Sequence, residues 1–184
     1  MRKFKAMDFN FRSINQPNRK NYIRYQGVVT EINPMIASGG RNRGCSQMVT
    51  VEGEDGGIAN FVISPETYVL DSVTLYEGMP VVMFYDADAP VPLIYPPQYR
   101  ATVAARAVPG QNIVVGYFDR NLTSEDLSLR LNIGVNTQVL TMNYQMFTGS
   151  PTNRNLIVVY GASTRSIPAQ TTPDRVIVMC GNTM

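Results

Sequence analysis

Short apolar runs, interrupted every few residues by Gly, Pro, Asn or Asp, constrain the fold of this chain more than any other feature. The runs are rich in β-branched side chains and are typical of strands bounded by turns. In the first half they are 25–32, 47–51, 58–63, 81–85 and 101–105. A single helix start, Ser64-Pro65-Glu66, would open one or two turns at most. The sequence therefore predicts an all-β protein.

The order of these runs predicts an OB-like small barrel over residues 22–106. Three strands, a short helical insertion and two more strands is the layout of a five-stranded, partly open barrel. Asp55-Gly56-Gly57 predicts a hairpin turn between the second and third strands. The connection 86–99 contains four prolines, so we expect a rigid surface loop there.

A second β domain is predicted over residues 107–184, after a boundary at 107–110. Alternating apolar and polar residues predict half-buried strands over 127–133 and 140–146. The continuous runs 156–160 and 175–180 suit strands that are covered on both faces. With 112–118 they make a small β-sandwich-like domain. We expect 161–174 to be a long polar loop and Cys180, at the end of its run, to be a buried thiol.

Residues 1–21 are predicted to be a basic and apolar N-terminal arm. Residues 1–43 carry nine basic and two acidic side chains, whereas the remainder carries seven basic and twelve acidic ones. Met7, Phe9 and Phe11 alternate with polar residues, which is the period of a strand with one apolar face. Two interpretations stay open: a strand docked on its own domain, or an arm that reaches another molecule. That molecule could be a polyanion such as nucleic acid, bound through the basic side chains of the arm, or the acidic body of a neighbouring copy.

Missing residue types argue against common catalytic chemistry. The chain has no histidine, which excludes Ser-His-Asp and Cys-His catalysis and removes the commonest metal ligand. Two cysteines, Cys45 and Cys180, are too few for a zinc set, and whether they pair is left open. We therefore predict no enzyme activity, no metal and no cofactor. Without a signal peptide or an apolar run near 20 residues, we expect a soluble protein made in the cytoplasm.

One loop has the composition of a ligand site. Arg41 and Arg43 lie in the glycine-rich segment 39–44, and Tyr22 and Tyr25 lie on or beside the first predicted strand. Guanidinium groups could bind phosphate while the rings stack on bases or sugars. A flexible hairpin loop is the alternative. Against a nucleic-acid groove, residues 22–106 carry five basic and nine acidic side chains.

Two segments carry a resemblance to a known family. Residues 85–99 (YDADAPVPLIYPPQY) and 164–173 (TRSIPAQTTP) are similar to an uncharacterised two-domain all-β family of spore-forming Gram-positive anaerobes. The resemblance implies a lineage, and with it a place in a spore or cell-surface structure, but no activity.

Two functions follow from the sequence. The first is a structural subunit that assembles with copies of itself into a coat, shell or fibre, through Met7, Phe9, Phe11 and sheet edges. Only 16% of residues are charged, which weakens the repulsion that keeps proteins monomeric. The alternative is an OB-type module that binds single-stranded nucleic acid or oligosaccharide through Tyr22, Tyr25, Arg41 and Arg43. A membrane partner is not expected.

Overall fold

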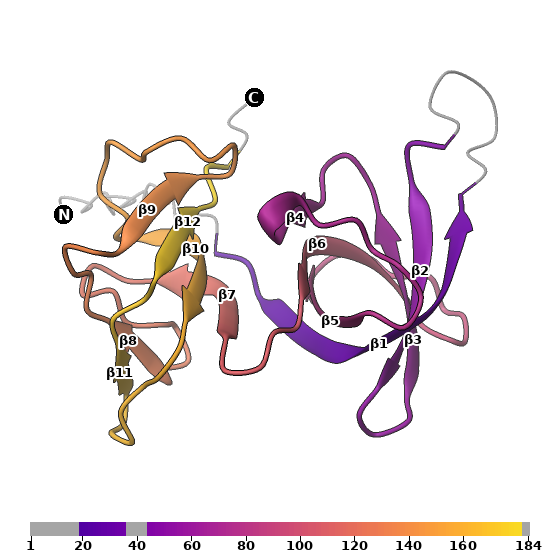
Figure 1. Cartoon of the computed structure of the whole chain (residues 1–184), viewed down its shortest axis with the longest axis horizontal. Helices are drawn as coiled ribbons and strands as arrows, with labels where there is room; N and C mark the ends of the chain where they lie inside the picture. The colour runs from indigo at the N-terminus through magenta and orange to yellow at the C-terminus, as the bar shows by residue number, and fades with distance from the viewer. Residues whose placement is uncertain (1–18, 36–43, 182–184) are drawn as a thin grey trace, which may run out of the picture.

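The computed structural model describes residues 19–35 and 44–181, and this part of the chain is all-β without an α-helix (Figure 1). No helix in it is long and apolar enough to cross a membrane. Strands β1–β6 gather on the right of Figure 1 and β7–β12 on the left. The elements are β1 (Tyr22–Pro34), β2 (Gln47–Gly53), β3 (Ile58–Ile63), β4 (Tyr68–Val69), the 3-10 helix η1 (Leu70–Ser72), β5 (Pro80–Asp86), β6 (Gln98–Arg106), β7 (Asn112–Phe118), β8 (Leu129–Leu131), β9 (Gln138–Thr141), β10 (Arg154–Tyr160), β11 (Ala169–Thr171) and β12 (Arg175–Val178).

Five strands of the first half close a small barrel. Four of the contacts are antiparallel, joining β1 to β2, β2 to β3, β1 to β5 and β5 to β6. The barrel closes through a short parallel pairing of β3 with β6, in which Phe61 lies opposite Tyr99. Alternate residues of each strand point inward, so Val49, Val51 and Phe61 form a buried core.

Strand β1 is long because it pairs with two strands, one along each part of its length. Its first residues pair with β5 and its last residues pair with β2, and Gly27 takes part in both registers. A Cβ at Gly27 would lie 2.1 Å from the carbonyl oxygen of Glu52. Only glycine fits where β2 approaches β1 this closely.

The local turn signals in this half were partly right. Residues 53–57 form the predicted hairpin turn, with Gly56 at a φ of 78°. The predicted helix start at Ser64 was wrong, because the hydroxyl of Thr67 accepts the N–H of Ser64 and donates to the carbonyl of Ala101. The first bond closes a local turn and the second ties the segment to β6, with which β4 then pairs in parallel. A tertiary pairing thus overrides the helix-start signal.

The second half is built around a four-stranded sheet in the order β7-β10-β12-β9. A two-stranded parallel sheet of β8 and β11 covers one face, where Leu156, Val158 and Val176 are buried. The other face, with Ile157 and Ile177, packs toward the barrel. The prediction that the two continuous apolar runs are covered on both faces is confirmed.

Several boundaries in this half differ from the sequence prediction. The alternating run 127–133 keeps strand geometry only over β8, because Leu127 has a φ of 59° and is 63% exposed. The run 140–146 turns back after β9, where the Thr141 N–H donates to the Gln145 carbonyl. The predicted loop 161–174 contains β11. Cys180 is exposed, so its predicted burial was wrong, since β12 ends before it.

The barrel and the four-stranded sheet share a buried cluster. From the barrel it includes Val82, Phe84 and Val103, which point outward from β5 and β6. From the sheet it includes Ile157 and Ile177. The expected boundary at 107–110 falls between β6 and β7, and the two units meet through these apolar side chains.

A polar contact joins the same two units at the edge of this cluster. Arg175 of β12 forms a two-pronged ion pair with Asp71 of η1. The N–H of Asp71 donates to the hydroxyl of Tyr144 at 2.7 Å. Asp71 and Ser72 both have positive φ, near 59° and 51°, a conformation that non-glycine residues adopt only when their surroundings hold it.

Candidate functional site

The predicted aromatic pair, Tyr22 and Tyr25, does not form one surface. The two residues are three apart on β1, so their side chains project from opposite faces. Tyr22 packs against the cluster shared by the two units, and Tyr25 packs against the barrel core. The hydroxyl of Tyr25 donates to the carbonyl of Gly57 at 2.8 Å, which gives it a role in holding the β2–β3 turn.

Tyr25 belongs to an aromatic cluster that spans the barrel. Its ring lies 5.3 Å from that of the fully buried Phe61, and Tyr85 stacks on Tyr99 at 3.9 Å between ring centroids. Burial and the hydroxyl of Tyr99 raise the pKa of Tyr85 to about 12. Sequence reasoning missed this cluster because it assigned Tyr99 to a loop, whereas β6 begins at Gln98.

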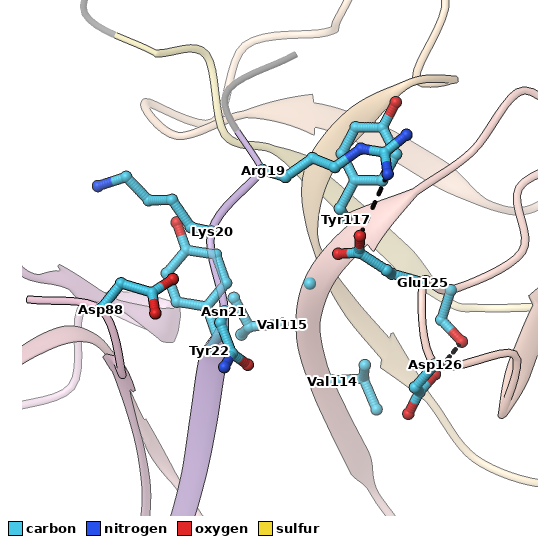
Figure 2. Close-up of a pocket in the computed structure, with 12 residues that line it drawn as sticks. Arg19, Lys20, Asn21, Tyr22, Asp88, Val114, Val115, Tyr117, Glu125 and Asp126 are labelled. Carbon is cyan, nitrogen blue, oxygen red and sulfur yellow. Dashed lines mark hydrogen bonds and ion pairs between the residues drawn. The ribbon is translucent and has the colours of Figure 1, made fainter. Parts of the chain in front are cut away.

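A cleft of about 520 Å³ lies between the segment that leads into β1 and strand β7 (Figure 2). One wall is the chain from Arg19 to Tyr22, and the other is β7 with the loop that follows it. Its lining residues are Arg19, Lys20, Asn21, Tyr22, Asp88, Val114, Val115, Gly116, Tyr117, Ser124, Glu125 and Asp126. Of the two sequence-predicted site residues that the structure describes, Tyr22 lines it and Tyr25 does not.

Ion pairs hold the lead-in segment at this cleft. Arg19 pairs with Glu125 at 3.2 Å, and its guanidinium carbon lies 4.6 Å from the centroid of the Tyr117 ring, as Figure 2 shows. Lys20 pairs with Asp86 at 3.4 Å. Each contact is partly exposed and worth at most about 1 kcal/mol, so together they position the segment rather than stabilise the fold.

Two titratable groups in the cleft are perturbed. Burial, together with the nearby carboxylate of Asp86, raises the pKa of Tyr22 to about 12. Burial also acts to raise the pKa of Asp126, but hydrogen bonds from Ser124 and Ser128 outweigh it and the pKa lies below the usual value. Tyr22 is therefore neutral and Asp126 ionised at neutral pH.

Strand β7 presents an open edge to this cleft. In β10 the carbonyls of Asn155 and Val159 accept N–H groups of Met179 and Asp174, so these residues point toward β12. By alternation, their β7 partners Tyr117 and Ile113, and Val115 between them, point away from β10. The Tyr117 carbonyl accordingly accepts the N–H of Glu125. Within the described residues, no backbone bond joins Val115 to a further strand.

A smaller concavity of about 290 Å³ lies on the outside of the barrel. Its lining residues are Met35, Ser46, Val62, Ser64, Glu66, Gln98 and Arg100. Met35 and Ser46 form the base of the β1–β2 loop, where the Met35 N–H donates to the Ser46 carbonyl. Arg100 has no ion pair in the described part of the chain.

The connection between β5 and β6 is the predicted proline-rich surface loop. Leu93 is fully exposed and Tyr95 is 86% exposed, and Val91 and Ile94 beside them are also exposed. Four large apolar side chains within five residues therefore point into solvent. Composition predicted the loop but did not indicate that its apolar side chains would be exposed to solvent.

The remaining candidate residues lie outside the described part of the chain. These are the assembly residues Met7, Phe9 and Phe11 and the ligand-binding candidates Arg41 and Arg43. Within the described residues, no group of three or more Cys, Asp or Glu side chains is arranged to hold a metal ion. Cys45 and Cys180 are both exposed and unpaired.

The chain matches no model of a known protein family and no curated protein.

Proposed function

We propose that the protein is a structural subunit that assembles with copies of itself into a coat, shell or fibre. The observation that carries the proposal is the apolar tip of the β5–β6 connection, residues 91–95. Contiguous exposed apolar side chains are rare on monomeric proteins and commonly mark protein–protein contacts. Pro92 within the tip and Pro90, Pro96 and Pro97 beside it limit backbone freedom, so docking the tip costs little conformational entropy.

Two further features support self-association. The charged fraction of 16% is low, so copies repel one another weakly. The open edge of β7 offers backbone groups to an added strand. A spore or cell-surface layer is the setting that we propose for such an assembly, in keeping with the resemblance of residues 85–99 and 164–173.

The test is the particle mass of the full chain. Replacing Leu93 and Tyr95 with Ser should lower the mass measured by light scattering and remove ordered particles from electron micrographs. The matched control replaces Val135 and Tyr76, two exposed apolar residues outside the tip, with Ser. A wild-type chain that stays monomeric at high concentration would contradict the proposal, as would an equal effect of both double variants.

We also propose that the barrel is of the OB type and that the second half is sandwich-like. The strand order β1-β2-β3-β6-β5, closed by the parallel β3–β6 pairing, supports the first assignment. The β4–η1 segment occupies the place of the short insertion between the third and fourth barrel strands. The packing of β8 and β11 on the four-stranded sheet supports the second.

A binding module is the second candidate, favoured by the concavity at Arg100. An unpaired guanidinium beside the amide of Gln98 suits a phosphate or a sugar hydroxyl. The loop that carries Arg41 and Arg43 begins at the rim of this concavity, at Met35 and Ser46. Single-stranded nucleic acid or an oligosaccharide would be the ligand.

Salt-dependent binding tests this candidate. If Arg41, Arg43 and Arg100 contact phosphates, affinity for single-stranded DNA or RNA should fall steeply with salt, and each Arg→Ala change should reduce the slope by about one. Arg106→Ala, an exposed arginine at the far end of β6, is the control. Absence of binding to single-stranded DNA, RNA and a glycan panel at low salt would remove the candidate.

A further inference from the structure

Strand β7 is the edge strand of its sheet, and the backbone groups on its outer side face a cleft. The N–H and carbonyl of Val115 point away from β10, into the cleft of about 520 Å³. Added strands bind such edges through main-chain hydrogen bonds and through side chains on alternate positions. The edge and the cleft together form an acceptor for an extended peptide.

The lining favours a peptide with one apolar face and basic residues. Val114, Val115 and the rings of Tyr22 and Tyr117 supply apolar surface. Three carboxylates, Asp88, Glu125 and Asp126, line the same cleft with two basic side chains, Arg19 and Lys20, so the lining carries a net charge of −1. Arg19 pairs with Glu125 and Lys20 with Asp86, whereas Asp88 has no ion pair within the described residues. The remaining negative charge attracts basic side chains of an incoming strand.

One segment of this chain has that composition. As an extended strand, residues 6–12 would place Met7, Phe9 and Phe11 on one face, and the arm around them carries Arg2, Lys3, Lys5 and Arg12 against the single Asp8. We infer that the β1–β7 cleft accepts residues 6–12 of a second copy as an added strand on β7. This inference rests on the proposed self-assembly and names the surface that carries it.

The exit point of the arm favours a second copy over the arm's own body. Arg19 lies at the Tyr117 end of the cleft, and β1 continues past Val115 from there. An arm that continued the direction of residues 22 to 19 would lead away from its own β7 and would have to reverse to return. Between Phe11 and Arg19 the chain can span about 26 Å at roughly 3.3 Å per residue. In a pair related by a two-fold axis, each arm can then cross directly into the facing cleft.

Disulfide trapping between two differently substituted copies tests the inference. Both chains carry Cys45→Ser and Cys180→Ser, because these thiols are free and exposed. One copy receives a cysteine on the polar face of the arm, at Asp8, Asn10 or Arg12. The other receives Gly116→Cys, where a Cβ meets no atom within 4 Å. A disulfide requires Cα atoms within about 7 Å, so only a strand seated on β7 can form it.

Mixing the two copies should give a cross-linked dimer for at least one arm position. The matched control moves the acceptor cysteine to Ser163, an exposed residue outside the cleft, and should give none. Particles that form without a cross-link at any arm position overturn the inference and leave the proposed function standing. A disulfide found only within a chain that carries both cysteines assigns the arm to its own body and also overturns it. A chain that neither assembles nor cross-links overturns both.

Discussion

Phe84→Ala tests whether the barrel and the four-stranded sheet unfold as one unit. Phe84 is 2% exposed and points from β5 out of the barrel, into the cluster that includes Ile157 and Ile177. Removing a buried phenyl ring costs about 3–5 kcal/mol, from lost transfer free energy and the cavity left behind. For a chain of this length each kcal/mol lowers Tm by about 2–4 °C, so a fall of roughly 6–20 °C is expected.

Urea and thermal unfolding provide the assay. The chain lacks tryptophan, so tyrosine fluorescence and far-ultraviolet circular dichroism are the probes. We expect one transition for the wild type and one, displaced transition for Phe84→Ala, because the mutated side chain belongs to a core that both units share. The control is Val28→Ala on the exposed side of β1, which should stay within about 0.5 kcal/mol of the wild type. Two separate transitions, with the later one unmoved by Phe84→Ala, would refute the shared-core reasoning.

Other changes have equally specific outcomes. Gly27→Ala should lower the urea midpoint severely, because its Cβ would overlap the Glu52 carbonyl, whereas Gly116→Ala should not. The pKa of Asp126 is lowered by folding, so its contribution is complete above the unfolded pKa and is lost as pH falls through the folded one. Asp126→Asn should therefore destabilise at neutral pH and progressively less in acid, in unfolding curves across pH. Folding raises the pKa of Tyr22 from 10.0 to about 12, so its contribution is complete below the lower value and is lost as pH rises to the higher. Tyr22→Phe should abolish one late step in the phenolate absorbance titration.

The fold class and most strand positions could be predicted from the sequence. The runs 58–63 and 112–118 coincide with β3 and β7, because β-branched residues between turn signals leave little alternative to a strand. The short strands β4 and β11 were not predicted, because each is set by a parallel partner distant in sequence. The alternating run 127–133 gave too long a strand, because the backbone turns at Leu127, which has a positive φ, and the hydrogen bonds to β11 reach only from Ser128 to Asn132.

Prediction of the candidate site was limited in the same way, because its contacts depend on residues distant in sequence. Tyr22 and Tyr25 were grouped by proximity in sequence, but their odd spacing places them on opposite faces of β1 once the strand is formed. The ion pairs of Arg19 with Glu125 and of Asp71 with Arg175 join residues more than 100 positions apart. No local pattern encodes such a pairing, because the two partners meet only after both units have folded.

Sequence alone determined which of the longer apolar segments become strands, where the hairpin turn forms and which residue types the chain lacks. These are local properties, fixed by side-chain shape, by the period of two and by the backbone preferences of glycine and proline. The tertiary structure decided which strand lies at the edge of its sheet, that both faces of β5 and of β10 are covered, and that Leu93 and Tyr95 remain exposed. Those properties depend on what packs against each surface, and burial is a relation between distant segments that no single segment contains.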